Sequence, residues 1–284
     1  MIETVAFDAD DTLWHNEHLF QDTQKKLEEI VQRYRPGEDI HDALFAVEMR
    51  NLKLFGYGIK GFTLSMVEAA IQLTEGRIPA AEVHEVVQLG KTMLEAPVDL
   101  LEGVEETLEA VKGRFRVILI TKGDIVDQTS KIERSGLADH FEQVEIVPRK
   151  DSGVYKGIFR RHGIDPARSV MVGNSMPSDV LPMLELGGFG VHVPYALLWA
   201  HEAHDEDPVS ERFHRLETLG ELPGLLERLR AAQEKEVAPL ARPPGDTVAV
   251  TVVEDLTTAL SQYPWLSFVA RGTSCAYEGW AVDV

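Results

Sequence analysis

The sequence predicts an α/β fold: a Rossmann-like parallel sheet core with a helical cap domain inserted after the first strand. Two patterns support this prediction. From about residue 103 to 229, short β-branched runs alternate with segments of helical periodicity, and such alternation implies a parallel sheet with right-handed crossovers. By contrast, residues 16–97 show helical periodicity only. A chain of 284 residues is long enough to bury a core of this kind.

The first predicted strand ends in a group of acids. The apolar run Val5–Phe7 is followed by Asp8, Asp10 and Asp11. Ligands of open α/β sheets bind outside the carboxyl ends of the strands, and neighbouring carboxylates repel one another unless a cation or hydrogen-bond donors compensate. A hard cation such as Mg²⁺ suits carboxylate oxygens. The alternative is an acidic turn, and for Asp11 we expect such a turn or N-cap role.

Four helices are predicted after this strand, at about residues 19–34, 39–55, 63–74 and 80–94. A loop, Gly56–Gly61, is expected between the second and the third. Its three glycines make it flexible, and Tyr57 and Lys60 supply an aromatic ring and a cation. We therefore expect it to contact the leaving group of a substrate, the alternative being an ordinary turn with Lys60 in solvent.

The remaining strands are predicted from short apolar runs. They are Arg116–Thr121, Gln143–Val147, Ser169–Gly173, Gly190–Val193 and Phe213–Leu216. Helices are expected between and around them, at about residues 104–112, 125–135, 152–162, 179–186 and 219–229.

Polar side chains follow several of these strands. A parallel sheet brings the carboxyl ends of its strands to one edge, so these side chains should form a single constellation. Its members are Asp8, Asp10, Thr121, Lys122, Lys150, Asn174 and Asp179.

Such a constellation suits phosphoryl transfer through a covalent intermediate. One carboxylate can attack phosphorus, and a second acid can protonate the leaving oxygen and then deprotonate water. A hydroxyl and an ammonium group stabilise the phosphoryl oxygens. A bound cation offsets the repulsion between the nucleophile and the substrate.

The strand ends also resemble the motifs of the haloacid dehalogenase (HAD) superfamily of hydrolases. The resemblance covers residues 4–229 and follows the family's order. Its four motifs are Asp8-x-Asp10-x-Thr12, then Thr121, then Lys150, then Gly173-Asn174-Ser175 with Asp179.

This resemblance implies a role for each residue. Asp8 is the expected nucleophile and Asp10 the general acid/base, while Thr121 and Lys150 complete the catalytic set and bind the phosphoryl group. The implied cofactor is Mg²⁺, held by the Asp8 carboxylate, the main-chain carbonyl of Asp10 and Asp179.

Two positions depart from the family's pattern. Asn174 stands where the fourth motif often has an aspartate, so it brings no charge, although its amide can still bond a metal-bound water or Lys150. Lys122 follows Thr121 where the family often has asparagine. Lys122 either adds positive potential at the substrate or is solvated.

The expected function is that of an Mg²⁺-dependent phosphatase acting on a small phosphorylated metabolite through an aspartyl-phosphate. A 2-haloacid dehalogenase is an alternative. Such an enzyme needs neither Mg²⁺ nor a second acid, so the presence of Asp10 and Asp179 favours a nucleophile that attacks phosphorus rather than carbon. A phosphomutase is a further alternative. From a different class, a non-catalytic, receiver-like phospho-binding module also combines Asp, Thr and Lys on a parallel sheet.

Composition limits the partners. The formal net charge of −19 argues against binding to nucleic acid or to an anionic membrane. Any phosphate site must then be locally positive. The single cysteine, Cys275, fits a reducing compartment, and neither a signal peptide nor a run of about 18 apolar residues is visible. We expect a cytoplasmic protein, and the sequence does not indicate its oligomeric state.

The expected domain organisation follows from these patterns. Residues 1–15 and 98–232 form the α/β core and residues 16–97 the helical cap. Residues 233–284 form a linker and a C-terminal extension of unknown role, with a possible strand at Thr247–Val253.

Overall fold

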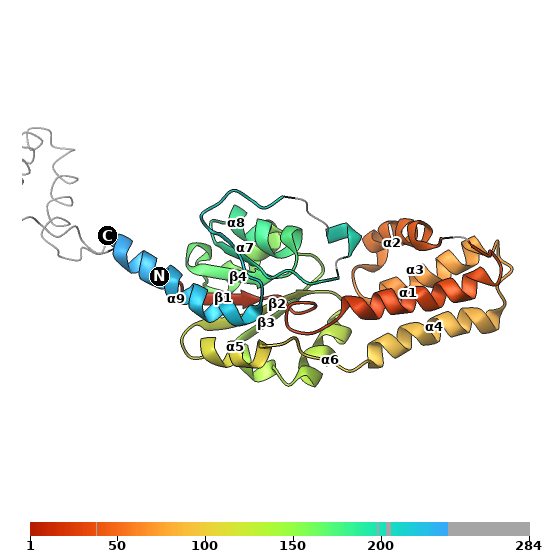
Figure 1. Ribbon diagram of the computed structural model, residues 1–284, viewed down its shortest axis with the longest axis horizontal. Helices are drawn as coiled ribbons and strands as arrows, with labels where there is room; N and C mark the ends of the chain where they lie inside the picture. Colours follow the sequence, from red (N-terminus) through yellow and green to blue (C-terminus); the bar gives the residue numbers. More distant parts are fainter. Residues whose placement is uncertain (38, 198, 203–205, 238–284) are drawn as a thin grey trace, which may run out of the picture. The chain divides into compact units, whose positions relative to one another are not determined.

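A computed structural model describes residues 1–37, 39–197, 199–202 and 206–237 of the chain. Its described part contains a six-stranded parallel sheet with the strand order β3-β2-β1-β4-β5-β6 (Figure 1). The predicted Rossmann-like sheet is therefore confirmed. Its strands are β1 (Thr4–Phe7), β2 (Arg116–Lys122), β3 (Gln143–Val147), β4 (Ser169–Gly173), β5 (Phe189–His192) and β6 (Phe213–Arg215).

Helices cover both faces of this sheet because side chains alternate along each strand. On β1, Val5 and Phe7 join a cluster with the helices on one face, whereas Ala6 joins a cluster on the other face. The first face carries α5 (Val104–Val111), α6 (Ile125–Ser135) and α9 (Leu222–Val237). The second carries α7 (Ser152–His162) and α8 (Leu181–Glu185).

Four further helices lie between β1 and α5 and have an apolar core of their own. Leu27, Leu44, Met66 and Val86, one from each helix, are buried together in it. The predicted helical insertion after the first strand is thus confirmed. The helices are α1 (Glu17–Gln32), α2 (His41–Phe55), α3 (Ile59–Leu73) and α4 (Ala80–Glu95).

The predicted loop Gly56–Gly61 is too long, because α3 begins at Ile59 rather than Thr63. Gly58, with φ of +113°, reverses the chain immediately before the helix, in a conformation that favours glycine. Gly61 then lies inside the helix, where a Cβ atom would stand 2.8 Å from the Gly56 carbonyl oxygen. The glycines therefore permit a tight helix-to-helix connection instead of a mobile loop.

The helix expected at residues 179–186 also differs. A π-helical turn, Met176–Val180, precedes the short α8. Ser175 caps this turn by accepting a hydrogen bond from the Ser178 backbone amide at 3.2 Å. The turn matters for the site because it contains Asp179.

The C-terminal boundary expected at residue 232 lies inside α9, which continues to Val237. The described residues up to Gln233 belong to one compact unit. The possible strand at Thr247–Val253 lies outside the described residues, and the expected domain boundaries stay a prediction. No described helix combines the length and the apolar character needed to cross a membrane.

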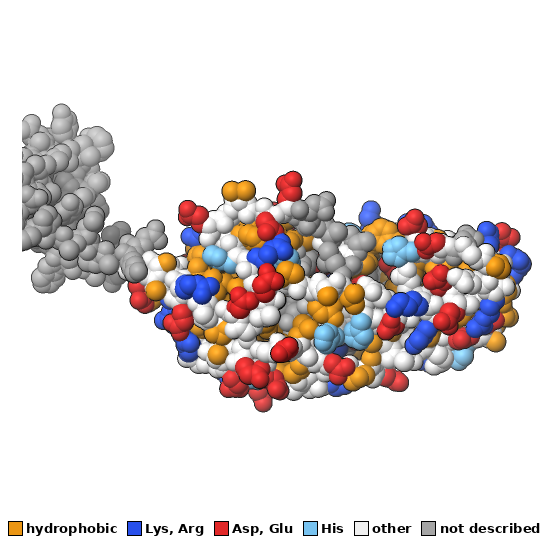
Figure 2. All heavy atoms as spheres, viewed as in Figure 1, with side chains coloured by type: hydrophobic (Ala, Val, Ile, Leu, Met, Phe, Trp, Pro, Cys, Tyr) orange, Lys and Arg blue, Asp and Glu red, His pale blue; other side chains and the backbone are white. Residues whose placement is uncertain are grey.

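Many of the acidic side chains lie at the surface. Glu105, Glu106 and Glu109 of α5 are exposed, in a region where acidic side chains gather in the space-filling view (Figure 2). Like charges spread over a surface keep a protein soluble and repel anions at long range. A site for an anionic substrate must therefore supply its own positive charge.

Candidate active site

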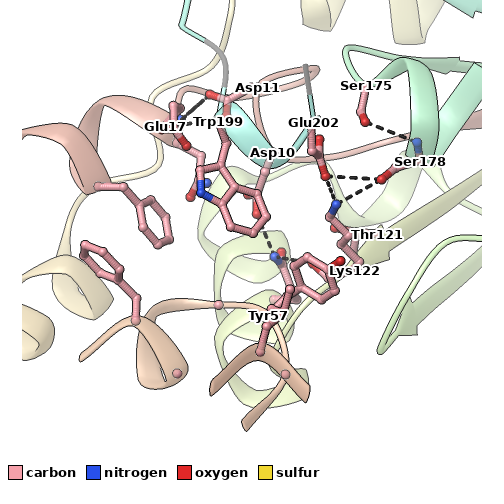
Figure 3. A pocket seen from close by; sticks show the side chains of 18 of the residues that line it. Asp10, Asp11, Glu17, Tyr57, Thr121, Lys122, Ser175, Ser178, Trp199 and Glu202 are labelled. Carbon is pink, nitrogen blue, oxygen red and sulfur yellow. Dashed lines mark hydrogen bonds and ion pairs between the residues drawn. The ribbon is translucent and has the colours of Figure 1, made fainter. Parts of the chain in front are cut away.

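A cavity of about 180 Å³ lies at the carboxyl edge of the sheet and extends between α1, α2 and α3 (Figure 3). It brings together every sequence-predicted site residue except Lys60. The predicted residues that line it are Asp8, Asp10, Thr121, Lys122, Lys150, Asn174 and Asp179.

Asp8 follows β1 directly and is 7% exposed. The Thr12 hydroxyl donates to its Oδ2 at 3.1 Å, and the Lys150 ammonium forms an ion pair with its Oδ1. Lys150 also lies 2.7 Å from Asp179 Oδ1. Burial raises the pKa of Asp8 to about 6 against the opposing effect of Lys150, and the neighbouring Asp179 raises it further. Two buried acids thus share one lysine.

Asp179 is held against β4 by a close backbone approach. A Cβ atom on Gly173 would lie 2.1 Å from Asp179 Oδ2, so a glycine is needed here. The Ser175 amide donates to the same oxygen at 3.0 Å. Asn174 contacts the first motif, because its backbone amide donates to Thr12 Oγ1 at 3.1 Å and its side-chain Oδ1 lies 3.3 Å from the same hydroxyl.

The donors at this edge are hard oxygen atoms. The expected ligand set contains two carboxylates, Asp8 and Asp179, with the main-chain carbonyl of Asp10. Among the described residues no cluster of three or more His, Cys, Asp or Glu side chains is arranged to hold a metal. Mg²⁺ is commonly bound through only one or two carboxylates, so this donor set fits the ion.

Asp10 lies within a set of hydrogen-bond donors that sequence analysis missed. Lys131 lies 3.0 and 3.1 Å from its two oxygens, while Gln128 and Trp14 each donate to it at 2.7 Å. Burial by itself raises the pKa of Asp10, but the Lys131 charge and these hydrogen bonds outweigh it and lower the pKa. A usable signal existed, because Gln128 and Lys131 are three residues apart and share one face of the predicted helix.

Lys122, at the end of β2, is directed at the cavity rather than at bulk solvent. Its ammonium lies 3.0 Å from Ser178 Oγ, forms an ion pair with Glu202 and stands 4.5 Å from the Tyr57 ring centroid (Figure 3). Burial lowers its pKa to about 8. The neighbouring Thr121 is 1% exposed and lines the same cavity. Lys122 thus lines the cavity and is paired with Glu202, and its effect on a substrate stays a prediction.

The comparisons with known proteins agree with this arrangement. Residues 2–187 match the model of the haloacid dehalogenase-like hydrolases. The chain belongs to this family. It is a HAD-type hydrolase with a Rossmann-like α/β fold, and the predicted family and fold class are confirmed.

Individual relatives differ in what they do. Pyrimidine 5'-nucleotidase YjjG of Escherichia coli is 26% identical over 151 residues, 49% of this chain and 64% of that protein, so the match spans less than two thirds of the relative. A haloacid dehalogenase-like hydrolase from Xanthomonas campestris is 39% identical, with a TM-score of 0.75 over 83% of this chain and 94% of that chain. A 2-haloacid dehalogenase from Pseudomonas syringae, 22% identical with a TM-score of 0.55 over 81% and 100%, shares the fold alone.

In this HAD-like hydrolase, Lys60 lies outside the cavity. Because α3 begins early, Lys60 is helical and pairs with Asp124 at 2.8 Å, with half of its side chain exposed. Tyr57 lines the cavity instead, with its ring 5.9 Å from Trp199 in an edge-to-face arrangement. The lining of the cavity therefore gives no support to the expected contact of Lys60 with a leaving group.

Asp11 has the structural role expected of it. Its Oδ1 accepts hydrogen bonds from the backbone amides of Asn16 at 2.8 Å and Glu17 at 3.0 Å. These amides stand at the start of α1 and have no partner within the helix. Asp11 thus fixes the entry of the chain into the helical insertion.

Proposed function

We propose that this HAD-like hydrolase is an Mg²⁺-dependent phosphatase that cleaves a small phosphorylated metabolite through an aspartyl-phosphate. The observation that supports the proposal is the carboxylate of Asp8. Thr12 and Lys150 bind its two oxygens at the carboxyl end of β1, and a second acid, Asp10, lines the same cavity. A nucleophile and a separate proton carrier are what a two-step hydrolysis needs.

In the first step an oxygen of Asp8 attacks phosphorus, and the bond between phosphorus and the ester oxygen breaks. Asp10, after taking up a proton against the charge of Lys131, gives that proton to the leaving oxygen. In the second step Asp10 takes a proton from water, which attacks the phosphorus of the aspartyl-phosphate and releases inorganic phosphate. The Lys150 ammonium and the Thr121 hydroxyl bind the phosphoryl oxygens, where charge is greatest.

The proposed metal ligands are Asp8, Asp179 and the main-chain carbonyl of Asp10. Asn174, which Thr12 ties to the first motif, adds an uncharged oxygen beside them. Bound Mg²⁺ would reduce the repulsion between the acids and the phosphoryl group. One fold relative, YfnB of Bacillus subtilis, was crystallised bound to magnesium.

The second acid, Asp10, favours phosphorus over carbon as the atom that Asp8 attacks. A dehalogenase of this family needs no proton donor at Asp10, yet here Lys131, Gln128 and Trp14 hold that carboxylate in the cavity. A phosphomutase would also need a cap that retains a bisphosphate. Membership of a hydrolase family leaves the receiver-like module without support.

The decisive experiment measures phosphate release from a panel of small phosphate esters, including p-nitrophenyl phosphate, with Mg²⁺ and with a chelator. We expect turnover that requires Mg²⁺ and no halide release from 2-chloropropionate. The opposite pattern, halide release without Mg²⁺ and no phosphate from any ester, would assign the protein to the dehalogenases.

We expect phosphate affinity to depend on pH through Lys122. Since burial lowers the pKa of this lysine to about 8, its ammonium loses its proton as the pH rises through that value. Ser178, Glu202 and Tyr57 surround it, and only the charged form attracts phosphate. The inhibition constant of inorganic phosphate should therefore rise severalfold between pH 7 and 9.5, and Lys122→Gln should remove most of this rise. An identical pH profile in the variant would contradict the assignment.

A further inference from the structure

The cavity continues beyond the phosphoryl end into the helical insertion, where its walls become aromatic. The Phe20 and Phe62 rings pack 5.0 Å apart between α1 and α3. Tyr57 and Trp199 close another side, and Leu52 of α2 completes the apolar lining. At about 180 Å³ the whole cavity is smaller than the roughly 300–1,000 Å³ of pockets for drug-sized ligands, so it suits a small leaving group.

Two carboxylates, Glu17 of α1 and Glu48 of α2, lie in this aromatic end. The Glu17 carboxylate accepts a hydrogen bond from the Gln21 side chain, and the Glu48 carboxylate accepts one from the Trp199 indole. Among the described residues, no lysine, arginine or histidine forms an ion pair with either glutamate.

The other acids that line the cavity have charged or backbone partners. Lys150 and Lys131 each form ion pairs with two of these acids, and Lys122 forms an ion pair with one. The remaining acid accepts hydrogen bonds from backbone amides. These pairs are Asp8 and Asp179 with Lys150, Asp10 and Asp127 with Lys131, Glu202 with Lys122, and Asp11 with the amides of α1. Glu17 and Glu48 thus differ from the other acids of the cavity, because a ligand can reach them and no cationic side chain of the described residues neutralises them.

The energetics agree with this geometry. Burial raises the pKa of both glutamates to about 7, and the charge of Glu17 contributes to the shift at Glu48. Two partly buried carboxylates are therefore costly to ionise without a counter-ion. A cation between them would remove that cost, and aromatic faces also attract organic cations.

We propose that Glu17 and Glu48, with Phe20, Phe62 and Trp199, form the leaving-group subsite and bind an organic ammonium group. The substrate is then the phosphate monoester of a small amino alcohol, with its phosphoryl group at Asp8 and its ammonium at the glutamates. This assignment rests on the proposed function. A sugar or a neutral base could hydrogen-bond the same groups, but it would leave them as costly to ionise as before, whereas an ammonium ion compensates their charge.

The test compares 3-aminopropyl phosphate with n-butyl phosphate, which has the same number of heavy atoms but no charge on its chain. We expect kcat/KM to be at least about tenfold higher for the ammonium ester. Glu48→Gln and Glu17→Gln should each lower that ratio at least about fivefold. The matched control is Glu85→Gln on α4, whose glutamate is half exposed, pairs with Arg33 and does not line the cavity, and it should keep the wild-type ratio.

A ratio near one in the wild type, or ratios unchanged in both glutamine variants, would overturn the ammonium subsite. Faster turnover of cytidine or uridine monophosphate than of the ammonium ester would assign the same end to a neutral base. Calorimetric binding of both esters to Asp8→Asn, with and without Glu48→Gln, tests the subsite independently of turnover. Absence of phosphate release from every ester, p-nitrophenyl phosphate included, would instead defeat the proposed function.

Discussion

Replacing Asp8 with asparagine is expected to abolish phosphate release, with kcat lower by a factor on the order of a thousand or more. Asparagine has the same shape and can still accept the hydrogen bond from Thr12, but its amide cannot form the acyl-phosphate bond. Lys150 keeps Asp179 as a partner at 2.7 Å, so the fold should persist. Steady-state phosphate release and a thermal melt of the same preparation measure the two effects separately.

The matched control is Asp11→Asn, which changes an acid of the same segment. Asp11 accepts hydrogen bonds from the backbone amides at the start of α1, and the side-chain oxygen of asparagine can accept the same bonds, so activity should stay within about tenfold of the wild type. If Asp8→Asn keeps substantial activity while it remains folded, a different side chain is the nucleophile.

Replacing Lys150 with methionine is expected to cause the largest loss of stability, about 3–5 kcal/mol at pH 8, and to remove activity. Methionine fills a similar volume but leaves Asp8 and Asp179 buried without their shared cation. The effect depends on pH in a defined direction. The pKa of Asp8 is already raised to about 6, so the folded state binds the proton more tightly than the unfolded state. The contribution of Asp8 to stability therefore falls as pH rises through that value.

Removal of Lys150 raises the pKa of Asp8 further, since it takes away the charge that lowered it. The loss of stability should accordingly be smaller at pH 5 than at pH 8, which urea unfolding at both values can measure. Lys156→Met is the control, because Lys156 lies exposed on α7 and its replacement should cost less than about 0.5 kcal/mol. Equal losses for the two variants at pH 8 would show that Lys150 does not compensate the buried acids.

Local sequence pattern was sufficient to predict the sheet and the order of the motifs. Apolar runs such as Ser169–Gly173 match observed strands, and Ile125–Ser135 matches an observed helix, because periodicity and capping act over a few residues. Parallel strands must bring their carboxyl ends to one edge. The meeting of Asp8, Lys150 and Asp179 in one cavity therefore followed from topology, although their catalytic roles remain proposals.

The surroundings of these residues were decided by tertiary structure alone. The pairing of Asp10 with Lys131, and that of Lys60 with Asp124, join positions distant in sequence. Glu17 and Glu48 belong to different helices of the insertion, and only the packing of those helices brings both to the cavity. Side chains that carry no motif acquire their environment from such long-range contacts. Sequence by itself thus specified the hydrolase fold and the candidate catalytic edge, whereas helix packing determined the charge, shape and polarity of the space beyond that edge.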